Sequence, residues 1–119
     1  MTNRQGASAA RREAARRARD AFPPMGVYAV RDRRTGQVRV AASRNVHAAI
    51  NRIRFELRLG SHLDRALQAA WRDGGEDRFC FEVLALVKER SDASFDYGAE
   101  LRLLEELHRG EHAREGGAP

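Results

Sequence analysis

The chain has 119 residues, a net charge of +5 at neutral pH and a single cysteine, Cys80. This length allows one domain of about 100 residues with short tails, and one cysteine excludes both a disulfide framework and a cysteine-based zinc cluster. No apolar run in the sequence is long enough to span a membrane and no secretory signal follows the N-terminus, so we expect a cytoplasmic protein.

The positive charge is concentrated in the first half of the chain. Residues 31–58 carry eight arginines against two acidic residues, a net +6, whereas residues 59–119 carry eight basic and thirteen acidic groups, a net −5. A basic half suits contacts with phosphates, and an acidic half could face away from a polyanion. The same arginines also fit an ordinary solvated surface, since 21 of the 22 basic residues are Arg and base composition alone can produce that bias.

The two ends of the chain differ in composition from its middle. Residues 1–24 form a basic arm rich in Ala and Arg, in which residues 7–21 are strong helix formers without large apolar side chains. Two prolines follow Phe22 and end this helix, because a residue before proline avoids the helical region. We therefore expect an independent basic helix in the arm, one domain over residues 25–109 and a disordered tail at 110–119.

The domain opens with two short strand-like runs, Val27–Val30 and Val38–Ala41, joined by the charged turn RDRRTG. Together they predict a β-hairpin whose loop is too long for the tight two-residue type. Ser43 or Asn45 then caps a helix, and Gly60 closes it. The apolar positions of this helix are spaced by four, three and four residues, which places them on one face. They are Val46, Ile50, Ile53 and Leu57.

Three further elements complete the domain. A second helix covers about 61–73, a third strand rich in aromatic and branched residues covers 79–87, and a last helix runs over about 97–108. The resulting order of elements is β-β-α-α-β-α. The side chains expected to face the core from the two helices are Leu63, Leu67, Ala70, Trp71, Leu101, Leu104 and either Leu107 or His108.

Five sequence motifs occur in this order: GVY at 26–28, VAASRNV at 40–46, GSHLDRALQAAW at 60–71, GGEDRFCFEVL at 74–84 and LLEELH at 103–108. Their order and spacing resemble those of the GIY-YIG nuclease domain family over about residues 25–108. The resemblance implies an α/β (α+β) sandwich in which helices flank a small three-stranded antiparallel sheet. It also implies a metal-dependent phosphodiesterase that acts on nucleic acid.

The resemblance assigns roles to individual residues. Tyr28 matches the tyrosine that helps to activate the attacking water, and Glu105 matches the helix glutamate that holds one divalent cation, Mg²⁺ or Mn²⁺. A hard cation prefers carboxylate oxygens, which suits that role. Glu106 is the neighbouring alternative, but on a helix it points about 100° away, so only one of the two can face a site.

Four positions depart from the family pattern. Arg39 stands where the family has its second tyrosine, Ala41 where it has a glycine, Ala49 where it has a helix arginine, and Asp64 where it has an asparagine. Arg52 lies three positions after Ala49, near the same helix face, and could supply the missing positive charge. Arg39 could do so as well, or could contact a phosphate directly. Neither arginine replaces a tyrosine hydroxyl as a proton acceptor.

Two functions from different classes follow. The first is an endonuclease that acts on nucleic acid, which we expect to be DNA, and uses Tyr28, Glu105 and a divalent metal with Arg39 and Arg52 as phosphate clamps. The second is a catalytically silent module of the same fold that binds nucleic acid or a protein partner. Binding through phosphates would weaken steeply with salt. The further arginines expected to contact phosphates are Arg31, Arg33, Arg34, Arg44, Arg54 and Arg58.

Two other groups of residues have simpler interpretations. Trp71 is expected in the core rather than as a platform for stacking bases. His108 and His112 have the i, i+4 spacing of a zinc pair, but Gly110 between them predicts an interruption of the helix, which argues against such a site.

Overall fold

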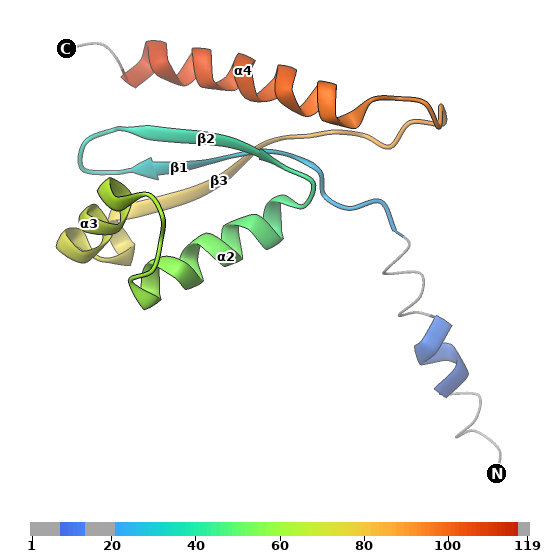
Figure 1. The fold of residues 1–119 in the computed structure, drawn as a ribbon, viewed down its shortest axis with the longest axis horizontal. Coiled ribbons are helices and arrows are strands. Elements are labelled where there is room, and N and C mark those ends of the chain that lie inside the picture. Colours follow the sequence, from blue (N-terminus) through green and yellow to red (C-terminus); the bar gives the residue numbers. More distant parts are fainter. Residues whose placement is uncertain (1–7, 14–20, 117–119) are drawn as a thin grey trace.

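The computed structural model describes residues 8–13 and 21–116, and its main body is a three-stranded antiparallel sheet with helices on both faces (Figure 1). The strands are β1 (Gly26–Asp32), β2 (Val38–Ser43) and β3 (Phe79–Leu86), in the spatial order β2-β1-β3. The helices are α2 (Val46–Leu59), α3 (Arg65–Gly74), the short η1 (Glu76–Arg78) and α4 (Tyr97–Gly116). This confirms the predicted α+β sandwich and its order of elements.

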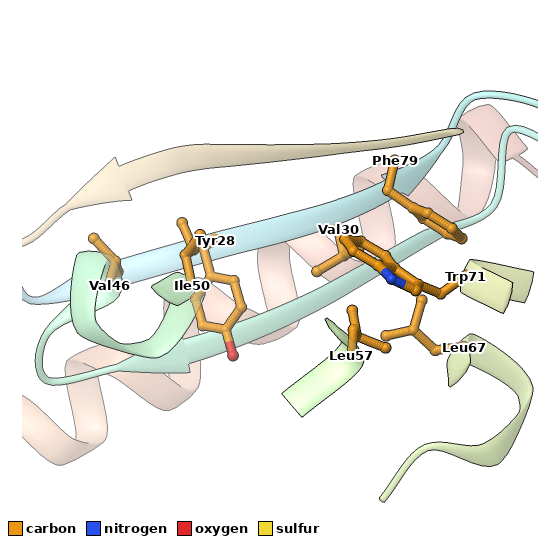
Figure 2. Close-up of a cluster of buried hydrophobic side chains, with 8 residues drawn as sticks. All are labelled: Tyr28, Val30, Val46, Ile50, Leu57, Leu67, Trp71 and Phe79. Carbon is orange, nitrogen blue, oxygen red and sulfur yellow. The ribbon is translucent and has the colours of Figure 1, made fainter. Parts of the chain in front are cut away.

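The central strand β1 is packed on both faces because its side chains alternate between them. Tyr28 and Val30 face α2 and α3, where they join the larger buried cluster shown in Figure 2. Val27 and Ala29 face the opposite side, where Leu104 of α4 packs against them. The two helical layers thus receive alternate residues of the same strand.

Close packing between β1 and β3 explains why the GVY motif begins with a glycine. A Cβ atom placed on Gly26 would lie 2.0 Å from the carbonyl oxygen of Ala85 in β3, so no side chain fits there. Beside it the β1–β3 register shifts between Val27 and Tyr28, whose partners are Ala85 and Val83. The glycine therefore allows β3 to approach β1 closely at the end of the sheet that carries Tyr28.

Helix α2 starts and ends where the sequence predicts. The side chain of Asn45 accepts a hydrogen bond from the Ala48 amide at 3.0 Å, and Gly60 takes a left-handed conformation with φ of 80°. Its buried side chains are Val46, Ile50 and Leu57, and Ile53 packs partly buried against the same cluster. Trp71 also lies in this cluster and stacks on Phe79 with ring centroids 5.6 Å apart, as expected of a core residue.

Helix α3 begins later than predicted, and this changes one core residue. Asp64 is its N-cap, and its side chain accepts a hydrogen bond from the Leu67 amide. Leu63 therefore lies in the loop before the helix and is exposed, so its prediction as a core residue is wrong. Leu67 and Trp71 are buried as expected.

Helix α4 is longer than predicted and runs through Gly110 to Gly116 rather than ending near His108. A single glycine costs a helix only about 1 kcal/mol. A contact of 3.6 Å between His108 Nδ1 and Glu111 spans Gly110, and the ion pair between Glu105 and Arg109 lies just before it. Residues 110–116, expected in a disordered tail, are thus helical here, and Gly110 does not interrupt the helix. His108, rather than Leu107, is the more buried of the two candidate inward residues.

The N-terminal arm is described only in part. Residues 8–13 are helical, and the rest of the helix predicted over 7–21 lies largely outside the described residues. None of the helices in the described part of the chain is long and apolar enough to cross a lipid bilayer.

Candidate functional site

A cleft opens on the sheet face that carries α2, and it contains two of the residues predicted to act on a phosphate. It is bounded by the end of β2, one side of α2 and the loop before α3. Tyr28 and Arg52 both line it, as does Ala49, the position where the family pattern has an arginine. The remaining lining residues are Ser43, Asn45, Ala48, Ile53, Glu56, His62, Leu63 and Asp64.

The Tyr28 side chain joins the core to this cleft. Its ring belongs to the buried cluster with Val46 and Ile50 of α2 (Figure 2), while the residue also forms part of the cleft wall. Burial raises the pKa of the Tyr28 hydroxyl, and the negative charge of Glu105 raises this pKa further. The phenol therefore stays protonated at neutral pH, so it can donate a hydrogen bond to an anion.

Glu105 reaches the free edge of β2 from α4. Its Oε2 atom accepts a hydrogen bond from the Ala42 amide at 3.3 Å, and its Oε1 atom pairs with Arg109. Arg109 also donates to the Val40 carbonyl oxygen at 3.0 Å. These contacts satisfy polar groups of β2, which lies at one edge of the three-stranded sheet. Glu106 is exposed, so of the two candidate carboxylates Glu105 is the one that faces the sheet.

The chemistry of Glu105 fits a magnesium or manganese ligand, but its present pairing does not leave it free. Mg²⁺ is often bound by one or two carboxylates together with water and substrate phosphates, and Glu105 offers such a carboxylate. Within residues 8–13 and 21–116 no three His, Cys, Asp or Glu side chains gather as a metal site. Arg109 already neutralises Glu105, so a cation at Glu105 requires that this ion pair open.

Arg39 lies on the same face of the sheet as Tyr28. Val30 and Arg39 are directly opposite in the β1–β2 pair, and Tyr28 is opposite Ala41. Directly paired residues in an antiparallel sheet share a face, so Arg39 points toward the layer of α2 and α3. The nuclease interpretation predicts that Tyr28, Arg39 and Glu105 converge on one concave patch. Tyr28 and Arg39 share a face of the sheet, but of the three residues only Tyr28 lines the cleft.

The guanidinium of Arg39 is paired with Asp64. Its Nε atom donates to Asp64 Oδ2 at 2.8 Å, and Asp64 Oδ1 accepts the capping hydrogen bond from Leu67 at 3.0 Å. The Leu67 amide and then Arg39 hold the pKa of Asp64 below its usual value, against the opposing effect of burial. Two of the four departures from the family pattern, Arg39 and Asp64, are therefore each other's partners.

Sequence reasoning quoted His62 as part of the GSH segment but gave it no role. The structure places His62 in the cleft wall, where its Nδ1 atom accepts a hydrogen bond from the Asp64 amide at 3.1 Å. An imidazole that accepts at Nδ1 carries its proton on Nε2 in the neutral form. The sequence feature that could have identified His62 is its position in the motif at 60–71, close to Asp64. It lies three residues before Arg65, the first residue of helix α3.

The predicted phosphate contacts outside the cleft are less free than the sequence indicates. Acidic partners hold three of them: Glu82 pairs with Arg31, Asp73 with Arg34 and Glu76 with Arg58. The guanidinium of Arg54 lies 4.5 Å from the ring centroid of Phe81. Arg33 and Arg44 are exposed. The basic surface is thus partly neutralised by the acidic second half of the chain, which does not simply face away from it.

Comparison with solved structures supports the fold inferred from the motifs. The chain is similar to the catalytic domain of homing endonuclease I-TevI, with a TM-score of 0.59 and 18% sequence identity over 73% of this chain and 86% of that domain. A mutant of the catalytic domain of intron endonuclease I-TevI aligns with a TM-score of 0.49 and 18% identity, over 67% of this chain and 82% of that one. No family model matches the sequence, and no curated protein is significantly similar to it.

The chain therefore has the fold of a GIY-YIG endonuclease domain. At 18% identity the similarity extends to the fold and not to the chemistry. What the site of this chain can do has to be argued from its own residues.

Proposed function

We propose that this domain binds DNA through its phosphate backbone, with the cleft beside α2 as the principal contact. The observation that carries the proposal is that a nuclease fold places the hydroxyl-bearing Tyr28 and the guanidinium of Arg52 in one open cleft. Both groups donate hydrogen bonds to anionic oxygens, and Arg52 adds a full positive charge.

The charge distribution supports the same function. Arg52 is 81% exposed, and its contact with Glu56 is a long one at 3.7 Å, so its guanidinium is available to a ligand. Exposed Arg33 and Arg44 lie in the basic first half of the sequence and are available for further phosphate contacts. Such contacts carry little information about base sequence.

The test is a binding titration of the full chain with fluorescent duplex, single-stranded and branched DNA over a series of salt concentrations. We expect the logarithm of affinity to fall linearly with the logarithm of salt concentration. Arg52→Gln should weaken binding to all sequences alike and reduce the salt slope by about one. The control variant is Asp77→Asn, an exposed substitution outside the cleft wall, which should leave affinity nearly unchanged. Absence of binding at low salt, or binding that is insensitive to salt, would contradict the proposal.

A second candidate function is hydrolysis of DNA as a Mg²⁺- or Mn²⁺-dependent endonuclease. The observation that favours it is that Glu105 accepts a hydrogen bond from the Ala42 amide, next to Ala41, the residue opposite Tyr28 in the β1–β2 pair. A divalent cation held by Glu105 would supply Lewis-acid stabilisation of the phosphate. Tyr28 would hydrogen-bond the reacting group, while Arg52 and Arg39 would balance charge that develops on the phosphate.

Cleavage assays with Mg²⁺, Mn²⁺ or EDTA separate the two candidates. For an endonuclease, we expect metal-dependent cutting that Glu105→Gln abolishes, because the carboxylate charge is lost with little change in shape. Arg109→Gln frees Glu105 and should then lower the metal concentration needed for half-maximal cutting. Binding without cutting under all these conditions would identify a silent nucleic-acid-binding module.

A further inference from the structure

We propose that Asp64 occupies the place of a substrate phosphate at Arg39, so that DNA binding in the cleft proceeds by exchange of the Arg39 guanidinium from Asp64 to a phosphate. The inference rests on the proposed DNA-binding function and adds to it a residue that limits affinity. Asp64 is thus an internal competitor, and Arg39 is a phosphate contact that is masked in the free protein.

The geometry of Asp64 allows this exchange without loss of helix α3. Its two carboxylate oxygens have different partners: Oδ1 caps the helix through the Leu67 amide, and Oδ2 holds Arg39. Release of Arg39 therefore leaves the cap in place. The remaining cost is one ion pair, while Asp64 keeps the hydrogen bond between its own amide and His62.

The exposure of the pair also suits exchange. The side chain of Arg39 is 24% exposed and that of Asp64 is 38% exposed, and Asp64 lines the cleft. An ion pair this accessible contributes little to stability because water competes with both partners. A phosphodiester, which presents two acceptor oxygens to the planar guanidinium, can replace a single Nε contact with a bidentate one.

The position of Arg39 on the sheet places it beside the proposed contact. Tyr28 is opposite Ala41, which lies two residues along β2 from Arg39 on the same face. Diagonal neighbours in an antiparallel pair are separated by about 7–8 Å, within the reach of long side chains. Tyr28 and a released Arg39 can therefore meet one phosphate or two adjacent ones.

Arg52, the arginine that lines the cleft, has a similar but looser arrangement. Arg52 has Glu56 beside it at 3.7 Å, and Glu56 also lines the cleft. Arg52 in the cleft wall and Arg39 beside Asp64 thus each have an acidic neighbour, which reduces the positive charge that a phosphate meets there. A phosphate that enters must compete with these carboxylates.

The experiment compares DNA affinities of four forms of the full chain: wild type, Asp64→Asn, Arg39→Gln and the double variant. Asparagine caps helices about as well as aspartate, so Asp64→Asn removes the charge and keeps the cap. We expect Asp64→Asn to bind duplex DNA about two- to fivefold more tightly than wild type, a range that fits an exposed ion pair. In the Arg39→Gln background the same change should have no such effect.

Controls separate release of Arg39 from a general charge effect. Asp77→Asn makes the same change in net charge at an exposed position outside the cleft wall and should leave affinity nearly unchanged. A urea denaturation curve for each variant verifies that it is folded. The inference is overturned if Asp64→Asn binds no more tightly than wild type, or if its gain persists without Arg39 or is matched by Asp77→Asn.

The outcome also distinguishes this inference from the proposed function. Binding by wild type with no gain in Asp64→Asn overturns the competitor role alone. Binding by Asp64→Asn but not by wild type supports the competitor role and overturns the proposed function of the wild-type chain. Failure of both forms to bind at low salt overturns the two proposals together.

Discussion

Two arginine–aspartate pairs near the β1–β2 turn have the same closest distance and very different surroundings. Arg78 and Asp32 meet at 2.8 Å where β1 ends, and their side chains are 11% and 4% exposed. Arg39 and Asp64 also meet at 2.8 Å, at the cleft, with 24% and 38% exposed. The chemistry of the two pairs is identical, so their burial and their other partners decide what each can do.

The pair at the end of β1 is built as a structural clamp. Asp32 receives two hydrogen bonds from the Arg78 guanidinium, at 2.9 and 2.8 Å, and another from the Arg34 amide at 2.9 Å. Arg78 in turn contacts Asp73 at 3.1 Å. This network ties the β1–β2 turn to η1 and to the start of β3, so neither partner can leave without exposing the other to an unfavourable environment.

The pair at the cleft has one hydrogen bond between its charged groups, and its aspartate keeps a second task when the arginine departs. The difference indicates that the same pair of residue types serves folding where it is enclosed and can serve binding where it is open. Similar substitutions in differently exposed ion pairs should therefore change the free energy of unfolding by different amounts.

The largest effect is expected at Asp32. Asp32→Asn should lower the free energy of unfolding by about 3 kcal/mol, because the Arg78 guanidinium loses its charged partner in a nearly closed site. Urea denaturation of the variant beside wild type measures the change. A loss as small as that of a surface substitution such as Asp77→Asn would contradict the structural role of the pair.

The loss of stability at acid pH should depend on the same ion pair between Asp32 and Arg78. Hydrogen bonds from Arg78 hold the pKa of the Asp32 carboxyl far below its usual value, so this carboxylate stabilises the fold above its unfolded pKa of about 4. That stability is lost as the pH falls through the folded pKa. Urea midpoints measured from pH 7 to pH 2 should therefore decline less steeply for Asp32→Asn than for wild type. Parallel curves would rule out a contribution from Asp32.

A smaller effect is expected at the cleft, where two substitutions of Asp64 separate its tasks. Asp64→Ala removes both the cap and the ion pair and should cost about 1 kcal/mol of unfolding free energy. Asp64→Asn keeps the cap and should cost clearly less. Equal losses, measured by the same urea method, would mean that the ion pair with Arg39 stabilises the fold more than its exposure allows.

The smallest effect is expected for an ion pair on the open surface. Arg58 and Glu76 meet at 2.7 Å, with both side chains more than half exposed. Glu76→Gln should leave the urea midpoint unchanged within error, because solvent and salt screen such a pair. A clear loss of stability would show that distance alone, rather than burial, ranks these pairs.

The sequence was sufficient for those parts of the structure that depend on local pattern. Alternation along β1 places Tyr28 and Val30 on one face, and the spacing of Val46, Ile50 and Leu57 fixes the buried face of α2. The motifs lead to the correct fold because turns and helix caps are marked by characteristic residues, such as Gly60 at the end of α2.

The contacts that determine the state of the site could not be predicted in the same way. The partner of Arg39 is Asp64, 25 positions later, and their meeting depends on where the loop before α3 crosses the sheet. The loop path also exposes Leu63, which helical spacing had placed in the core. Likewise, Arg109 neutralises Glu105 only because α4 continues past the position where its end was predicted.

The most direct test of the account is to follow the Nε–H signals of Arg39 and Arg78 by NMR while duplex DNA is added to the wild-type protein at low salt. The account predicts that the Arg39 signal shifts progressively as its Nε–H hydrogen bond changes acceptor from Asp64 to a phosphate, while the Arg78 signal stays in place. An Arg39 signal that does not move while DNA binds, or that moves together with Arg78, would contradict it.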